Sequence, residues 1–160
     1  MSSLTPTQKQ IMGHAFLVMF VGLFAGLGLA ASLVDGFEFI PGIITEFSIP
    51  GDAGAWARAH AGGLLNGIMM IAVALTITGL GCDEKMTARL KWMLIGTGWA
   101  ITIFYYGALF APNRALTFAD NKWGESNLAS IIGLLPALIF AFVMMYVALI
   151  MARQAFSSDH

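Results

Sequence analysis

Four long stretches of the chain contain no Asp, Glu, Lys or Arg and consist mainly of apolar residues. Each is longer than the ~20 apolar residues that a helix needs to cross a bilayer. The first is also longer than the apolar core of a typical signal peptide, so it is interpreted as a retained helix. The pattern predicts a single all-α membrane domain over residues 1–160, a four-helix bundle with helices near 10–34, 58–81, 92–111 and 127–152.

Composition supports a membrane environment. Of the 160 residues, 58% are hydrophobic and only 11% are charged, whereas soluble domains carry roughly 25% charged residues. The net charge of -1 leaves no basic face for phosphates, which excludes a nucleic-acid partner. Four spans place both termini on one side, where Lys and Arg outnumber those on the opposite side by five to three. This distribution favours cytoplasmic termini in a bacterial-type inner membrane.

The connection between the first two predicted helices, residues 35–57, differs from the rest of the chain. It mixes apolar residues with four acids, and Pro41-Gly42 and Pro50-Gly51 mark turns. The segment is too broken and too polar to cross a bilayer. We expect it to lie in the membrane interface or to fold over the helix ends as a lid, and a purely structural cap is equally consistent with the pattern.

Histidines are the first candidates for chemistry inside the spans, because ionisable groups there are costly. His14 lies near the terminal side of the first predicted helix, and His60 near the opposite side of the second. At about 1.5 Å rise per residue, roughly 20 Å of depth separates them, so one haem within a protomer cannot bind both. A haem would then have one axial ligand and an open position. On residue type alone, an interfacial histidine bonded to water is the more frequent role for His60.

Two further polar side chains are expected at similar depth, since Asn66 and Tyr105 lie on helices that reach the same membrane face. An amide donor and a phenol donor in one apolar pocket would form an oxyanion-type cradle. Hydrogen bonding between helices is the alternative for each of them, and taken singly it is the commoner one.

Arg58 and Arg114 are predicted at that same face. They are candidates for binding the carboxylates of a haem or for pairing with Glu46 and Asp52, and a solvated interfacial arginine is the alternative. No carboxylate lies inside any predicted span, so the acid–base pair of a hydrolase is missing. Chemistry in these spans would need an imported electrophile.

Seven short segments, within residues 35–70 and 104–118, carry a shared pattern. They are Gly36-Phe-Glu-Phe-Ile-Pro-Gly, Glu46-Phe, Pro50-Gly, Trp56-Ala-Arg-Ala-His60, Leu65-Asn66-Gly67, Phe104-Tyr105 and Pro112-Asn-Arg-Ala-Leu-Thr-Phe118. Together they resemble the motifs of the styrene oxide isomerase family, with the histidine, asparagine and tyrosine in the same order. The hydrophobic layout agrees over nearly the whole chain.

The resemblance implies a trimeric enzyme that carries ferric haem b and converts lipophilic aryl epoxides to aldehydes, such as styrene oxide to phenylacetaldehyde. By position, His60 resembles the axial haem ligand, and Asn66 and Tyr105 resemble the pair that positions the epoxide. Ferric iron would act as a Lewis acid, and a 1,2-hydride shift would follow ring opening. Two alternatives stay open at this point: an electron-transferring membrane cytochrome b, and a non-enzymatic transporter or assembly subunit.

Overall fold

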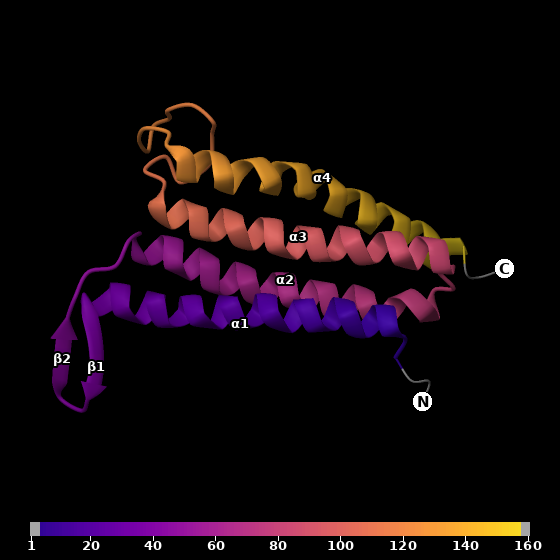
Figure 1. The fold of residues 1–160 in the computed structure, drawn as a ribbon, viewed down its shortest axis with the longest axis horizontal. Coiled ribbons are helices and arrows are strands. Elements are labelled where there is room, and N and C mark those ends of the chain that lie inside the picture. Colours follow the sequence, from indigo (N-terminus) through magenta and orange to yellow (C-terminus); the bar gives the residue numbers. More distant parts are fainter. Residues whose placement is uncertain (1–3, 158–160) are drawn as a thin grey trace.

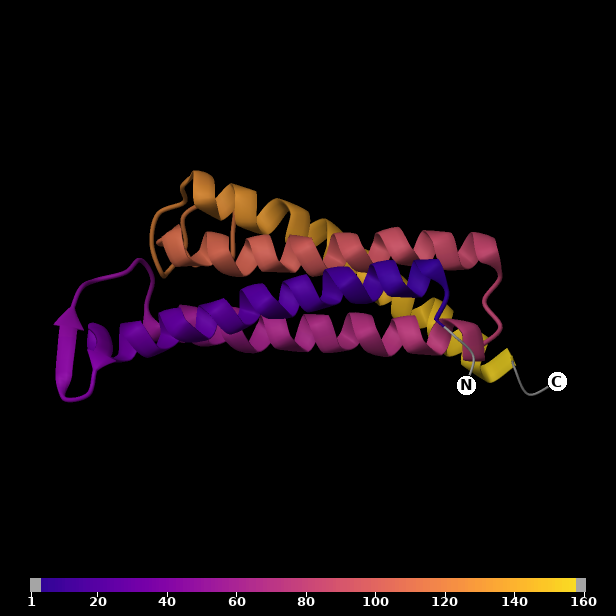
Figure 2. The ribbon, with the colours of Figure 1, turned by 60° about the horizontal axis from the view of Figure 1, so that its bottom comes forward.

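The computed structural model describes residues 4–157, and residues 1–3 and 158–160 lie outside the described part. Four long helices run side by side, with both chain ends at one end of the bundle (Figure 1). Turning the molecule shows that the fourth helix crosses the others obliquely (Figure 2). All four are long and apolar enough to cross a membrane, as predicted. They are α1 (Pro6–Val34), α2 (Ala53–Gly79), α3 (Glu84–Phe110) and α4 (Leu128–Ser157).

The first three helices begin earlier than the charge-free stretches indicated, because each is started by a polar cap. Thr5 and Gln8 form a reciprocal capping box at the start of α1. Asp52 caps α2 and Asp83 caps α3, each by accepting a hydrogen bond from a backbone N–H three residues on. The first turns therefore contain charged residues that a hydropathy boundary leaves out.

The fold is mostly helical, as predicted, but the connection after α1 contains a β-hairpin that the sequence pattern did not indicate. Strands β1 (Gly36–Ile40) and β2 (Ile43–Glu46) pair antiparallel. Pro41-Gly42 forms the turn, with Gly42 at φ +84, and the Glu38 carboxylate accepts a hydrogen bond from Gly42 N at 2.6 Å. Within the described residues the hairpin packs on α1 and on no other helix. It extends sideways from the bundle rather than over the other helix ends (Figure 1).

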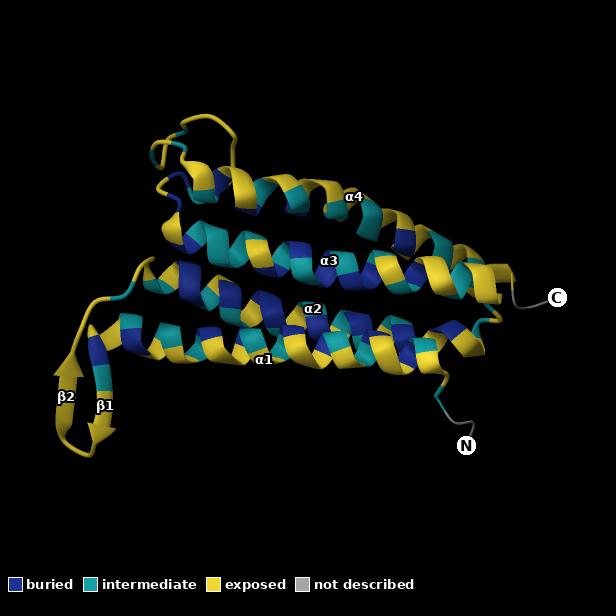
Figure 3. Cartoon of the chain, in the orientation of Figure 1, coloured by how far each residue is buried: buried dark blue, intermediate teal, exposed yellow. Residues whose placement is uncertain are grey.

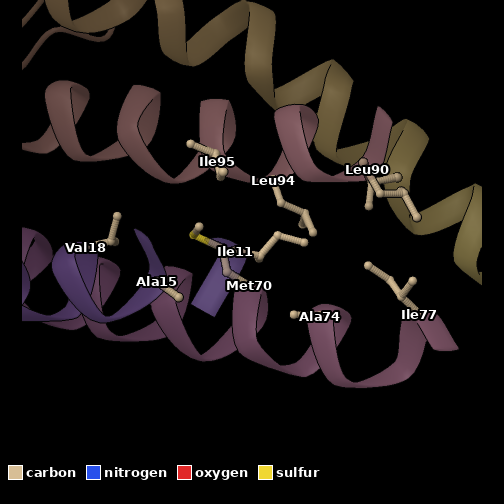
Figure 4. Close-up of a cluster of buried hydrophobic side chains, with 10 residues drawn as sticks. Ile11, Ala15, Val18, Met70, Ala74, Ile77, Leu90, Leu94 and Ile95 are labelled. Atoms are coloured by element: carbon tan, nitrogen blue, oxygen red, sulfur yellow. The ribbon is translucent and has the colours of Figure 1, made fainter. Parts of the chain in front are cut away.

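The larger buried cluster occupies the half of the bundle nearest the chain ends, and a second one, which includes Ala25, Trp56 and Leu109, lies toward the hairpin end. Residues on the outer helix faces are exposed (Figure 3), and many of them are large and apolar. Exposed apolar faces of this kind suit contact with lipid. Figure 4 shows how side chains from the four helices meet in the larger cluster. Its fully or almost fully buried members are Ile11, Ala15, Val18, Met70, Ala74, Ile77, Leu90, Leu94, Ile95 and Val147.

Small residues set the distance between α1 and α2. A Cβ atom added to Gly63 would lie 2.6 Å from the Cα of Gly22, and one added to Gly67 would lie 2.9 Å from the carbonyl oxygen of Ala15. Glycines at these positions therefore bring the two backbones together. At the other end of the pair, the Gln8 amide donates to the Ala74 carbonyl at 2.8 Å.

Candidate functional site

His60 lies on the face of α2 that packs against α1. Its Nδ1 is 2.9 Å from the carbonyl oxygen of Gly22. Because a carbonyl only accepts hydrogen bonds, Nδ1 carries the proton in this pair, and in the neutral ring Nε2 keeps its lone pair. Gly26 leaves room for the ring, since a Cβ there would lie 2.9 Å from Nδ1. Two glycines of α1 thus fix the position and tautomer of the imidazole.

Tyr105 comes from α3 and packs on a different face of α2. Its ring lies directly on Gly62, where an added Cβ would be 2.5 Å from the phenol oxygen. Gly62 follows His60 by two residues, a rotation of about 200° around the helix. The imidazole and the phenol therefore lie on roughly opposite faces of α2. Within residues 4–157 the Tyr105 hydroxyl makes no hydrogen bond to another protein group.

Asn66 carries an unpartnered polar atom inside the span. Its Nδ2 is one of two buried side-chain nitrogen or oxygen atoms without a hydrogen-bond partner in the described part of the chain. Asn66 follows Gly62 by four residues, only about 40° around the helix, so it lies on the side of α2 that Tyr105 contacts. Asn66 and the Tyr105 ring therefore lie on one side of α2, and His60 lies on the side that faces α1.

Arg58 and Arg114 line two adjoining cavities at the end of the bundle that carries the hairpin. The cavities measure about 390 Å³ and 250 Å³, and Tyr105 lines the smaller one. Arg114 forms an ion pair with Asp52 at 3.6 Å, one of the two carboxylates expected from the sequence. Its guanidinium also stacks 3.7 Å above the centre of the Trp123 ring. Trp123 was not singled out in the sequence, where a lone tryptophan in a polar loop resembles an interfacial anchor.

The loop between α3 and α4 positions Arg114, and Asn113 organises that loop. The Asn113 side chain is fully buried, donates to the carbonyls of Thr117 and Ala119, and accepts from Ala115 N and the Ser130 hydroxyl. Arg114 and Ala115 both adopt positive φ, at 61 and 52, which this bonding pattern holds. Sequence reasoning missed Asn113, although an asparagine directly after a proline is a turn signal.

His14 has a different role from His60. Its Nδ1 accepts a hydrogen bond from the Trp99 indole at 3.1 Å. The α1 residues that contact His60 follow His14 by eight to twelve positions, about 12–18 Å of helix rise. Two imidazoles so far apart cannot bind one iron within a protomer, in line with the depth argument from sequence.

Other metal or nucleophile arrangements find no support in residues 4–157. No group of three or more His, Cys, Asp or Glu side chains there is placed to hold a metal ion. Burial raises the pKa of the Cys82 thiol, and the negative charge of Asp83 raises it further. A thiol with a raised pKa stays protonated at neutral pH and is a poor nucleophile. His60 is thus the best-placed side chain for a single bond to iron.

Two comparisons with known proteins identify the family of this chain. The family model for styrene oxide isomerase matches residues 7–156 of the chain. A styrene-oxide isomerase of Pseudomonas fluorescens is 42% identical over 151 residues, which cover 94% of this chain and 89% of that protein. The family match spans parts of all four helices and includes His60 and Asn66 on α2, Tyr105 on α3 and Arg114 in the loop after α3. The chain therefore belongs to the styrene oxide isomerase family and is an isomerase.

Proposed function

We propose that this protein converts styrene oxide and related aryl epoxides to aldehydes within a membrane, with a haem b bound through His60. The observation that carries the activity is the identity of 42%, over 94% of the chain, with a styrene-oxide isomerase. The four apolar helices suit a substrate that partitions into lipid. We place them in the inner membrane of a bacterial-type cell with the termini in the cytoplasm.

The residues of the chain fit a haem. The proton of His60 is engaged by the Gly22 carbonyl, so Nε2 is free to bind iron, and such a backbone partner is typical of histidines that bind metals. Arg58 and Arg114, which line the cavities at that end of the bundle, are the candidates for binding the haem carboxylates. When bound in its ferric form, the haem supplies a Lewis acid for the epoxide oxygen.

Asn66 and Tyr105 would position the substrate. Both side chains present a donor without a protein partner in the described structure. A donor aimed at the epoxide oxygen stabilises the negative charge that develops as the benzylic carbon–oxygen bond breaks. A hydride then moves from the oxygen-bearing carbon to the benzylic carbon, which yields the aldehyde. Substrate and product are isomers, so the reaction consumes no proton, electron or water.

The apolar surroundings protect this reaction. Water would add to the benzylic cation and give a diol, so the pocket must be dry. In the described residues, no Asp or Glu lies inside the spans between the capped ends of the helices. A general base that would activate water is therefore missing from the interior, which favours rearrangement over hydrolysis.

We also propose that the protein is a trimer. His60 and the ring of Tyr105 lie on roughly opposite faces of α2, so groups from one protomer do not converge on one substrate. A neighbouring copy can supply Asn66 and Tyr105 to the face at which His60 binds the haem. Closed cyclic symmetry would repeat this site at each interface.

The test of the haem assignment is His60→Ala. Purified wild-type protein should show the absorption spectrum of ferric haem and should convert styrene oxide to phenylacetaldehyde without any electron donor. His60→Ala should lose both, whereas His14→Ala, the matched control on α1, should keep both because His14 bonds Trp99 instead. Full haem occupancy in His60→Ala would show that another residue binds the iron. Turnover that depends on an electron donor would favour a redox protein.

A further inference from the structure

A cleft between α3 and α4 lies at the end of the bundle opposite the hairpin, near the C-terminus of α4. Its volume is about 470 Å³, and it is separate from the cavities that Arg58 and Arg114 line. The α3–α4 cleft has polar and charged groups at one end and apolar side chains along its wall. It is lined by Asp83, Lys85, Met86, Arg89, Leu90, Met93, Tyr146 and Ile150.

The charged end of the α3–α4 cleft favours an anion. Lys85 and Arg89 are four residues apart on α3, so their side chains point from the same face of the helix. Neither forms an ion pair with a carboxylate in residues 4–157, where the ion pair between Arg114 and Asp52 stands alone. Asp83, the cap of α3, accepts a hydrogen bond from Met86 N at 2.6 Å, and with its carboxylate counted the lining of the cleft still carries a formal charge of +1. Two cations are thus available to a ligand.

The apolar wall indicates what kind of anion fits. Met93 on α3 and Tyr146 on α4, which is 52% exposed, continue the cleft toward the middle of the helices, and Ile150 lies nearer the charged end. On α3, Trp92 is 67% exposed, and the Lys91 ammonium lies 4.7 Å above the centre of its ring. An exposed tryptophan next to lysines is typical of the headgroup level of a bilayer. The cleft therefore begins at headgroup depth and runs toward the hydrocarbon.

We propose that the α3–α4 cleft binds one anionic phospholipid. Lys85 and Arg89 bind the phosphate, and an acyl chain lies against Ile150, Met93 and the ring of Tyr146. Basic clefts between membrane helices on the cytoplasmic side bind anionic headgroups in this way. Inorganic phosphate lacks the chain and gains nothing from the apolar wall.

The experiment is native mass spectrometry of the purified full-length protein with added phosphatidylglycerol or phosphatidylcholine of identical acyl chains. The wild type should bind one molecule of phosphatidylglycerol in preference to phosphatidylcholine. The double variant Lys85→Gln/Arg89→Gln should lower that affinity roughly 10- to 30-fold, since each cation near a lipid surface contributes about one factor of five. The matched control, Lys9→Gln/Arg153→Gln, removes two charges from the same end but outside the cleft and should bind as the wild type does.

Four results would overturn the proposal. The first is equal retention of the two lipids by the wild type. The second is equal loss of binding in the control variant, which would make the effect one of net charge. The third is a change of oligomeric state in Lys85→Gln/Arg89→Gln, which would make the cleft an interface between copies. The fourth is competition by millimolar inorganic phosphate, which would point to an anion site without a lipid. The variant Lys85→Arg/Arg89→Lys keeps both positive charges and should bind phosphatidylglycerol as the wild type does.

Discussion

Asn66 shows how a single residue can be kept at a cost to stability. A buried donor without a partner costs about 1–3 kcal/mol relative to a satisfied one. The Nδ2 atom of Asn66 is in this situation within the described structure, whereas the buried amide of Asn113 has all its groups bonded. Asn66 lies on the side of α2 that Tyr105 contacts, so the proposed substrate site would explain why a residue unfavourable for folding is kept there.

Asn66→Leu should therefore separate stability from activity. Leucine has a similar volume and no unsatisfied donor, so we expect the melting temperature in detergent to stay the same or rise. The rate of styrene oxide isomerisation should fall by roughly 10²–10³, as for the loss of one oxyanion donor.

Asn113→Leu is the contrasting variant. It breaks four hydrogen bonds of a fully buried side chain and should lower the melting temperature. If Asn66→Leu instead destabilised the protein and kept full turnover, Asn66 would be a structural residue.

At this scale, the sequence singles out the polar residues inside the spans but does not tell in which direction their side chains point. Polar side chains are rare inside the spans, so His60, Asn66 and Tyr105 stood out. The partner of His60 is a backbone carbonyl, that of Gly22, and no sequence pattern marks a carbonyl. The Tyr105 ring packs on Gly62, and nothing in the sequence marks this glycine as its contact. These facts depend on which faces of the helices meet.

Among the elements, the contact of α1 with α2 has the most influence on the site. Gly22 takes part in it twice, because its Cα touches Gly63 and its carbonyl accepts from His60. Any side chain at Gly63 meets backbone atoms rather than a flexible group, so the helices must separate. Separation would move the carbonyl away from the imidazole. The packing of α1 on α2 and the position of the Gly22 carbonyl beside His60 are thus coupled through Gly22.

Gly63→Ala should test this coupling. We expect a loss of stability of about 1–3 kcal/mol, typical of overpacking, together with weaker haem retention. Gly79→Ala on the same helix is the matched control, because a Cβ there meets nothing within 4 Å. Thermal unfolding and the haem absorbance per protein would be measured for both. Equal behaviour of the two variants would mean that the α1–α2 contact is softer than the geometry indicates.

The elements themselves were predictable to different degrees. Long apolar stretches are sufficient to predict spanning helices, and all four are present. Their starting residues were placed too late, because caps such as Asp52 and Asp83 belong to polar turns. The hairpin was missed since its strands of five and four residues are short and lie between turn signals. Short strands in a loop give little periodicity to read.

For the whole molecule, the orientation of the groups around α2 decides how many chains form one site. The imidazole of His60 faces α1, so in the proposed haem site the iron would lie on a side that Asn66 and Tyr105 do not reach in the same protomer. Neither cavity lined by Arg58 and Arg114 includes His60. A site formed between neighbouring protomers resolves both observations, because the second copy brings its own α2–α3 face to the first.

Hybrid oligomers would test this directly. His60→Ala subunits and Tyr105→Phe subunits, each inactive alone, are co-expressed with different tags, and complexes that carry both tags are isolated in two steps. In a cyclic trimer, every such hybrid contains one interface at which an intact His60 faces an intact Tyr105, so the hybrids should have about one third of wild-type activity. The same subunits expressed separately and mixed after purification serve as the control and should stay inactive. If the hybrids are also inactive while each variant assembles normally, both residues must act within one protomer, and α2 would have to rotate to bring them together.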